Sequence, residues 1–183
     1  MRDSKLQNIS IIIPAQNDGK FLKSLLTSIN NQTIHPKETI IVDSSTNSIA
    51  RDILEEYNDS IPVTYHYVEK AYPGKARNIG VKLANGDWIA FLDAKTLPKE
   101  DWLERYLHLM EAYHADAVFG VTQFDAKTSF QKVLRAATYG KIGHHTVPGT
   151  VIKKKVFSDS GGFLEHVRMG EDIEWRERLI KNG

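Results

Sequence analysis

Two periodicities of hydrophobic and polar residues run along the chain. Short runs of β-branched and aliphatic residues, such as ISIII at residues 9–13, end at a proline, an aspartate or a polar turn and predict buried strands. Between these runs, apolar residues recur at every third or fourth position, as Leu22, Leu25 and Leu26 do, and predict amphipathic helices. The predicted strands span residues 9–13, 39–42, 63–68, 87–92 and 117–121, and the predicted helices span residues 18–31, 48–57, 73–83 and 102–110.

The regular alternation of strands and helices predicts an α/β fold. Because the strands are apolar almost throughout, they fit a mostly parallel sheet that is covered by helices on both faces. The alternation breaks after Thr122. Beyond it we predict a helix at residues 124–139, a polar loop at 141–145, a strand at 147–152 and a final helix at 171–181. We therefore expect a single domain over residues 1–183, with a regular half at 1–122 and a partly irregular half at 123–183 that lies over the sheet edge.

Composition and charge narrow the range of functions. The 183 residues include 24 basic and 23 acidic ones, so the chain lacks the basic excess of most nucleic-acid-binding domains, and we predict no nucleic-acid partner. The absence of cysteine excludes disulfides, thiolate zinc sites and cysteine nucleophiles. No apolar run reaches the length of a membrane span, and no signal-peptide core is recognisable. We expect a cytoplasmic protein, and peripheral contact with the inner face of the membrane is left open.

Several common nucleotide and hydrolase motifs are missing. No GxGxxG follows the first predicted strand, and neither GxxxxGK[ST] nor GxSxG occurs, which argues against dinucleotide oxidoreductases, P-loop enzymes and α/β-hydrolases. Ligands of open parallel sheets bind beyond the carboxyl ends of the strands. Asp43 and Asp93 each follow a predicted strand directly, so both are candidate ligand-binding residues, although aspartate also commonly begins a loop.

Five segments of the chain resemble family 2 glycosyltransferases, in the same order and at matching spacing. They are IIIPAQN at residues 11–17, IVDSSTN at 41–47, GKARNIG at 74–80, GDWIAFLDAK at 86–95, and GGF at 161–163 followed by GED at 170–172. The resemblance covers nearly the whole chain and implies a GT-A fold, in which a Rossmann-like sheet binds a nucleotide-diphosphate sugar. Residues 1–122 would form the nucleotide-binding half and residues 123–183 the acceptor-side half. The chain stops soon after the last motif, so we expect either a piece of a longer member or a short one.

The implied activity is transfer of a sugar from a nucleotide-diphosphate donor, which we expect to be UDP-linked, to an acceptor hydroxyl. The acceptor would be a saccharide, a lipid-linked molecule or another hydroxyl compound. Transfer requires a base that removes the acceptor's proton. The resemblance assigns this role to Asp172, with Glu171 as its acidic neighbour in the catalytic set. Judged from the residues alone, both carboxylates could simply complement the N-terminus of the predicted helix.

The resemblance also implies which residues surround the nucleotide. The nucleotide-binding set would be Pro14, Ala15, Asn17, Asp43, Arg77, Asp93 and Lys95. Asp43 would accept a hydrogen bond from the base N–H. Arg77 would add positive charge beside the nucleotide, or else form a surface salt bridge. Arg178 matches a family arginine and would either contact the diphosphate or support Glu171, which lies seven positions earlier on the same predicted helix.

The metal-binding element of the family is altered. Its usual third residue is an aspartate that helps to hold Mg²⁺ or Mn²⁺, but the chain has Lys95 there. A lysine ammonium repels a divalent cation and could instead contact the diphosphate directly. Three interpretations compete: a metal-independent transferase, a metal site of Asp93 completed by other residues, and a catalytically silent module that binds nucleotide sugars.

Three further features receive simpler interpretations. The pair His144-His145 fits an acceptor loop or plain surface better than a metal site, because adjacent residues rarely point the same way. The basic run at residues 153–155 is typical of a solvated helix start. Trp88, Trp102 and Trp175 all lie in apolar patterns and are expected in the core.

Overall fold

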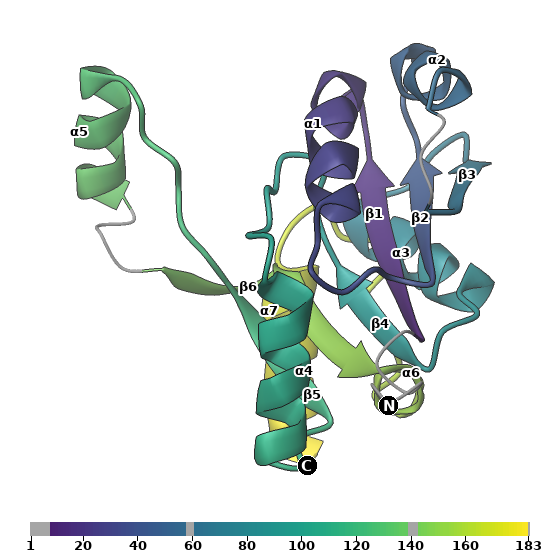
Figure 1. Ribbon diagram of the computed structural model, residues 1–183, viewed down its shortest axis with the longest axis vertical. Coiled ribbons are helices and arrows are strands. Elements are labelled where there is room, and N and C mark those ends of the chain that lie inside the picture. Colours follow the sequence, from purple (N-terminus) through teal and green to yellow (C-terminus); the bar gives the residue numbers. More distant parts are fainter. Residues whose placement is uncertain (1–7, 58–60, 139–142, 183) are drawn as a thin grey trace.

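The computed structural model describes residues 8–57, 61–138 and 143–182. A six-stranded sheet, with strand order β3-β2-β1-β4-β6-β5, forms the centre of the molecule (Figure 1). The strands are β1 (Ile9–Ala15), β2 (Glu38–Asp43), β3 (Val63–Tyr67), β4 (Trp88–Phe91), β5 (Ala117–Thr122) and β6 (His144–Lys153). The helices are α1 (Gly19–Asn30), α2 (Ile49–Glu55), α3 (Pro73–Leu83), α4 (Trp102–Ala112), α5 (Ser129–Thr138), α6 (Lys154–Asp159) and α7 (Glu171–Asn182). The predicted α/β fold with a mostly parallel sheet is confirmed.

Residues of β1 alternate between two hydrophobic layers. Ile11 and Ile13 pack in a cluster that includes residues of α1 and α4, whereas Ile12 packs in a second cluster with residues of α3, α6 and α7. All three isoleucines are fully buried. Since successive side chains of a strand point to opposite faces, a run of β-branched residues fits a strand that is covered on both sides. Helices therefore cover both faces of the sheet, as the apolar strands predicted.

The strand register places the carboxyl ends of β1, β2 and β4, where we expected a ligand to bind, next to one another. β1 pairs in parallel with β2, where Ala15 stands beside Asp43, and on its other side with β4. The carboxyl ends of these three strands therefore point to the same end of the sheet. Strands in a sheet are about 4.8 Å apart, so the ends of β2 and β4 are separated by roughly 10 Å. Asp43 and Asp93 consequently lie on either side of the end of β1.

The second half of the chain contributes more to the sheet than expected. β6 lies between β4 and β5 and runs antiparallel to both, so it is inserted into the sheet and does not lie over its edge. It also begins at His144, inside the segment that we expected to be a polar loop. Residues 141 and 142 of that segment lie outside the described residues. The apolar run at residues 147–152 predicted the buried part of β6. The strand also includes the exposed His144 and His145, which have no hydrophobic pattern that would predict a strand.

The helix α5 stands apart from the layered body in Figure 1. It begins at Ser129, later than the predicted start at residue 124, and residue 139 of the predicted helix lies outside the described part of the chain. Phe130 and Val133 on this helix are 75% and 67% exposed. Across the described residues, no helix has the length and apolar character that a membrane crossing requires.

Candidate functional site

Asn17 joins the two loops that follow β1 and β2. Its φ of 57° lies in the left-handed region, which asparagine tolerates better than most residues. From this position its side-chain Oδ1 accepts hydrogen bonds from the Thr46 backbone N–H (3.1 Å) and from the Asn47 amide (3.0 Å). Its own backbone N–H donates to Ser45 Oγ at 2.7 Å. The first two motifs therefore form one hydrogen-bonded unit at the edge of the sheet.

Asp43 is fully buried beneath this unit. One of its carboxylate oxygens accepts hydrogen bonds from the backbone N–H and the hydroxyl of Ser45, and the other accepts one from the Tyr65 hydroxyl at 2.9 Å. Burial, together with the neighbouring Asp43 carboxylate, raises the pKa of Tyr65. Since the Asp43 side chain has no exposed area, a nucleobase reaches it only if Ser45 or Tyr65 moves aside. Tyr65 was not predicted to belong to the site.

Pro14 and Ala15, which precede the loop after β1, contact the neighbouring strand through their backbone. Pro14 and Ala15 are the last two residues of β1 and pair with Val42 and Asp43 of β2. The carbonyl oxygen of Ala15 also accepts a hydrogen bond from the Ser44 backbone N–H at 2.9 Å. These contacts fix the point at which the chain leaves the sheet and turns toward Asn17.

Arg77 is a buried cation that connects two acidic residues. Its Nη2 lies 2.8 Å from Asp93 Oδ1, and its Nη1 lies 2.8 Å from Glu171 Oε1. The guanidinium carbon is 5.5 Å from the centre of the Phe163 ring, a distance that allows a cation–π contact. Burial disfavours the charged form, but the two carboxylates outweigh this effect, so the pKa of Arg77 is raised. Arg77 therefore does form salt bridges, as one alternative expected, but they are not at the surface, because only 4% of Arg77 is exposed.

The two ion pairs bring the end of β4 to the start of α7. Asp93 follows β4, and Glu171 is the first residue of α7, so a single guanidinium holds the fourth and fifth motifs together. Glu171 is 5% exposed, and its carboxylate is paired with Arg77. Asp172 is half-buried, and its Oδ1 accepts a hydrogen bond from the Ile173 backbone N–H at 2.9 Å. Of the acidic pair, Asp172 is therefore the one that a bound molecule can reach.

Lys95 has a partner on the neighbouring loop. Its Nζ lies 2.8 Å from Oδ1 of Asp18, the residue immediately before α1, and 5.6 Å from the centre of the Phe21 ring. The Lys95 side chain is 62% exposed and the Asp18 side chain 29%. Asp18 was not predicted to belong to the site, and its place directly before a glycine-initiated helix was the available signal.

The residues at the altered metal-binding element do not fit a divalent ion. Mg²⁺ at a phosphate-binding site is usually held by one or two carboxylates together with waters and phosphate oxygens. Asp93 directs one oxygen at the Arg77 guanidinium, and the next expected ligand position holds the Lys95 ammonium. Among the residues that the structure describes, no group of three or more histidine or acidic side chains is arranged to hold a metal. His144 and His145 are neighbours along β6, paired with Thr122 and Val121 of β5.

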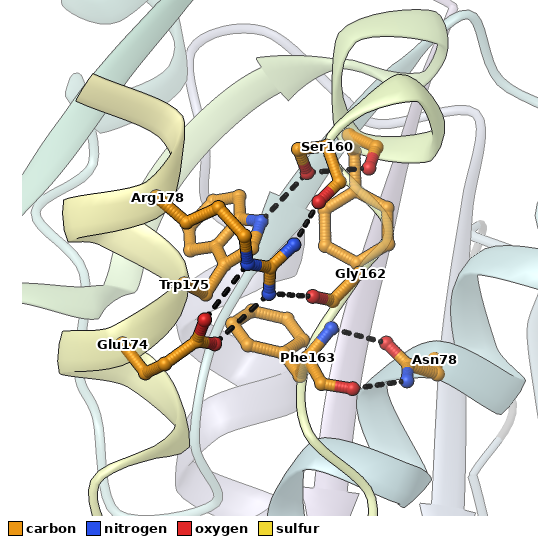
Figure 2. Close-up of polar contacts among 8 residues, drawn as sticks. Asn78, Ser160, Gly162, Phe163, Glu174, Trp175 and Arg178 are labelled. Carbon is orange, nitrogen blue, oxygen red and sulfur yellow. Dashed lines mark hydrogen bonds and ion pairs between the residues drawn. The ribbon is translucent and has the colours of Figure 1, made fainter. Parts of the chain in front are cut away.

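Arg178 fixes the loop before α7 (Figure 2). Its Nε and Nη2 lie 2.8 Å and 2.9 Å from the two carboxylate oxygens of Glu174, and Nη2 also donates to the Gly162 carbonyl at 2.6 Å. Nη1 donates to the carbonyl of Ser160. The expectation that Arg178 supports Glu171 is wrong, because Glu171 pairs with Arg77 and Arg178 pairs with Glu174.

An aromatic cluster holds the same loop and helix against the sheet. Trp175 has no exposed area, packs against the rings of Phe91 and Phe163, and donates from Nε1 to Ser160 Oγ at 2.9 Å. Figure 2 shows Asn78 facing the backbone of Phe163, with which its amide forms a pair of hydrogen bonds of 2.8 Å and 2.9 Å. Asn78 lies in the third motif, but no local pattern distinguishes it there from its neighbours. It ties α3 to the last motif.

The other predicted features have structural roles. Trp102 and Trp175 are buried in the core as expected, whereas Trp88 is only partly buried and has the Lys153 ammonium over its ring, 5.4 Å from the ring centre. Residues 153–155 do begin a helix, since α6 starts at Lys154. Lys153 forms an ion pair with Asp116.

Comparisons with curated proteins assign most of the chain to one family. A model of glycosyl transferase family 2 matches residues 10–164. The glycosyltransferase AglE of Haloferax volcanii is 26% identical over 194 residues, and the match covers 98% of this chain and 64% of AglE. The pre-mycofactocin glycosyltransferase of Mycobacterium tuberculosis is 26% identical, with 97% of this chain and 40% of the relative covered. This chain therefore spans less than two thirds of the length of either relative.

Solved structures show a similar fold. TarS 1–349 of S. aureus in complex with UDP-GlcNAc has a TM-score of 0.72 at 22% identity, covering 94% of this chain and 53% of that one. The mannosyltransferase PcManGT of Pyrobaculum calidifontis in complex with GDP-Man and Mn²⁺ has a TM-score of 0.70 at 22% identity, with 94% and 51% covered. At these identities the likeness establishes a shared fold.

Proposed function

The chain belongs to glycosyl transferase family 2, and on that premise we propose that it transfers a sugar from a UDP-linked donor to an acceptor hydroxyl, with Asp172 as the general base. The observation that carries the proposal is the bridge made by Arg77 between Asp93 and Glu171. It holds the start of α7 at the carboxyl edge of the sheet, where open α/β sheets bind their ligands. The acidic residue next to the bridge, Asp172, is then available to an acceptor.

The donor proposal rests on the loops beyond β1 and β2. The carboxylate of Asp43, which now accepts hydrogen bonds from Ser45 and Tyr65, would accept one from uracil N3–H after one of these two residues moves aside. Asn17 joins the loops after β1 and β2 by hydrogen bonds, so the loops on either side of the nucleotide would already be held together. TarS, a structural neighbour, has been solved both with UDP-GlcNAc and with UDP, and this supports a UDP-linked donor here.

The reaction follows from the charges at the site. Asp172 accepts the proton of the acceptor hydroxyl, whose oxygen forms a new bond to the anomeric carbon of the donor. The bond from that carbon to the diphosphate oxygen breaks, and its electron pair leaves with UDP. Glu171 cannot easily share the role of base, because its buried carboxylate is neutralised by Arg77. The acceptor class and the cytoplasmic location stay predictions.

An asparagine substitution tests the assignment of the base. Asp172→Asn keeps the shape of the side chain and removes its ability to take a proton. With UDP-glucose or UDP-GlcNAc as donor and UDP release as the readout, we expect turnover to fall about 10²- to 10⁴-fold. UDP affinity, measured by calorimetry, should change less than about twofold, because the substitution leaves the nucleotide loops intact.

A matched variant and two outcomes complete this test. Glu177→Gln neutralises an exposed acidic residue on the same helix and should leave turnover and UDP affinity unchanged. Near-normal turnover in Asp172→Asn would show that another group is the base. UDP binding by the unsubstituted chain, without turnover of any donor, would instead favour the silent nucleotide-sugar-binding module.

A further inference from the structure

We propose that Lys95 supplies the positive charge that binds the donor diphosphate in place of a divalent ion, and that Asp18 is the partner it leaves when the donor arrives. The inference rests on the proposed function, since it concerns the same donor. It is carried by the ion pair between Lys95 and Asp18, at 2.8 Å, and by the two carboxylates bound to Arg77.

The ion pair lies where a donor phosphate would enter. Asp18 lies in the loop that follows β1, and Lys95 lies in the loop that follows β4, the parallel neighbour of β1. The pair therefore spans the carboxyl ends of two adjacent parallel strands, which is where ligand phosphates bind in open α/β sheets. A diphosphate that enters between these loops meets the Lys95 ammonium directly.

The local balance of charge disfavours a divalent ion at Asp93. Asp93 and Glu171 share one guanidinium, so their negative charge is already partly neutralised by Arg77. A divalent ion bound to Asp93 would be close to two positive charges. One is the guanidinium of Arg77, which pairs with Asp93, and the other belongs to Lys95, two residues after Asp93 in the sequence. Because both cations would repel the ion, the arrangement favours direct contact between lysine and phosphate.

The ion pair between Lys95 and Asp18 is easy to exchange for another partner. The Lys95 side chain is 62% exposed, and exposed ion pairs contribute little to stability. A lysine ammonium is a compact charge on a flexible stem, so it can turn from Asp18 to a neighbouring anion without a movement of the backbone. A diphosphate carries more negative charge than one carboxylate and therefore attracts the ammonium more strongly.

The test measures binding of UDP, UMP and uridine by calorimetry, each in EDTA and in Mn²⁺. For the unsubstituted chain we expect UDP affinity to be the same within about twofold in the two conditions. Lys95→Ala should weaken UDP binding roughly 10- to 100-fold and leave uridine binding unchanged, because uridine has no phosphate. Asp18→Asn should tighten UDP binding by about two- to fivefold by removing the competing carboxylate.

Lys20 provides a matched control. Its ammonium lies 5.1 Å from the centre of the same Phe21 ring, but Lys20 belongs to helix α1, whereas Lys95 lies in the loop after β4. Lys20→Ala removes one positive charge nearby and should change UDP affinity less than about twofold. Lys95→Asp restores the acidic residue of the family pattern, and UDP binding by this variant should become dependent on Mn²⁺.

The outcomes separate this inference from the proposed function. If UDP binds only in Mn²⁺ and Lys95→Ala binds it normally, Lys95 does not replace a metal, while donor binding stands. Equal losses of UDP and uridine binding in Lys95→Ala would also overturn the inference, since they indicate a general disturbance of the site. If neither UDP nor uridine binds in any condition, both the inference and the proposed function are wrong.

Discussion

Arg77 and Glu171 are 94 residues apart in the sequence, yet Nη1 of the guanidinium lies 2.8 Å from Oε1 of the carboxylate, and both side chains are buried. Asp93 binds the other terminal nitrogen of the same guanidinium. The three residues belong to α3, the loop after β4 and α7. The geometry of the candidate site therefore depends on one arginine that connects three separate parts of the chain.

Removal of this arginine should be costly. We expect Arg77→Met to lower the free energy of unfolding by about 3–5 kcal/mol, because Glu171 is left as a buried charge without its partner. Adding Glu171→Gln should recover part of the loss by removing that charge. Denaturant unfolding of the variants measures both effects. Arg105→Met, which breaks an exposed pair with Asp101 at 3.7 Å, should cost less than about 1 kcal/mol; a similar cost for Arg77→Met would contradict the role given to the bridge.

The link made by Asn17 predicts an effect on nucleotide binding. Asn17→Gly removes the side-chain hydrogen bonds to the loop after β2 but suits the left-handed backbone. UDP affinity should fall by about 1 kcal/mol, roughly fivefold, with a small change in stability. Asn17→Ala should weaken UDP binding to the same extent and destabilise the fold by about 1 kcal/mol more, because alanine is strained at this φ. Unchanged UDP affinity in both variants would show that the nucleotide does not need the joined loops.

A substitution of Arg178 shows whether this residue stabilises the fold or binds the diphosphate. Arg178→Lys cannot bind both carboxylate oxygens of Glu174 and the carbonyls of the loop before α7 at once. We expect a loss of about 1–3 kcal/mol in unfolding free energy and no change in UDP affinity. The same denaturation and calorimetry experiments decide the matter. A large loss of UDP affinity at unchanged stability would instead place Arg178 at the diphosphate.

Close packing between α3 and β1 makes Gly80 sensitive to substitution. A Cβ atom at this position would lie 2.3 Å from Cγ2 of Ile12. Gly80→Ala should destabilise the fold by about 1–3 kcal/mol, although alanine favours the helix by itself. In combination with Ile12→Ala, the loss should be smaller than the sum of the two single losses, because the new methyl group occupies vacated space. Lys82→Ala, on the same helix, serves as the exposed control, and strict additivity would argue against the contact.

Glu38 should make stability depend on pH in the acid range. Burial opposes its charged form, but hydrogen bonds from Ser10 and Asn85 and the nearby charge of Lys37 outweigh burial and lower the pKa of Glu38 below its usual 4.5. A lowered folded-state pKa means that this carboxylate stabilises the fold fully above the unfolded-state pKa of about 4.5 and loses that contribution as the pH falls through the folded-state value.

The corresponding variant is Glu38→Gln. It should cost about 1–3 kcal/mol at neutral pH and show a weaker loss of stability below about pH 4.5 than the unsubstituted chain. Thermal unfolding from pH 3 to pH 7 measures the difference. Glu111→Gln, an exposed substitution, should reproduce the unsubstituted profile. Parallel pH profiles for the unsubstituted chain and Glu38→Gln would show that Glu38 does not contribute.

Local sequence patterns were sufficient to predict most of the fold. The isoleucine run of β1 predicted a strand that is buried on both faces, because β-branched side chains on both faces of a strand need a layer of helices on each side. The last helix, α7, begins at Glu171 as predicted. The place of β6 was not predictable in this way, because strand order depends on contacts between distant segments. Its histidines are exposed and provide no apolar signal.

The polar contacts of the site were still harder to predict. The motifs identified Asp93, Glu171 and Arg77 as important residues, but nothing in the local pattern specifies that the arginine binds both acids. The pairing of Lys95 with Asp18 likewise depends on the adjacency of β1 and β4. Such contacts depend on which strands become neighbours in the sheet, and the local pattern of a single sequence does not specify the strand order.

The inserted position of β6 has a consequence for biosynthesis. A ribosome makes β4 and β5 before β6, so the nascent chain first carries two strands that cannot pair with each other in the final order. The edge of β4 stays open until residues 144–153 have left the ribosome, and an open apolar edge is a site for misassociation between chains. The sheet is therefore completed only after β6 has been made, and a ribosome that stalls shortly after residue 122 would leave a product with an exposed, aggregation-prone strand.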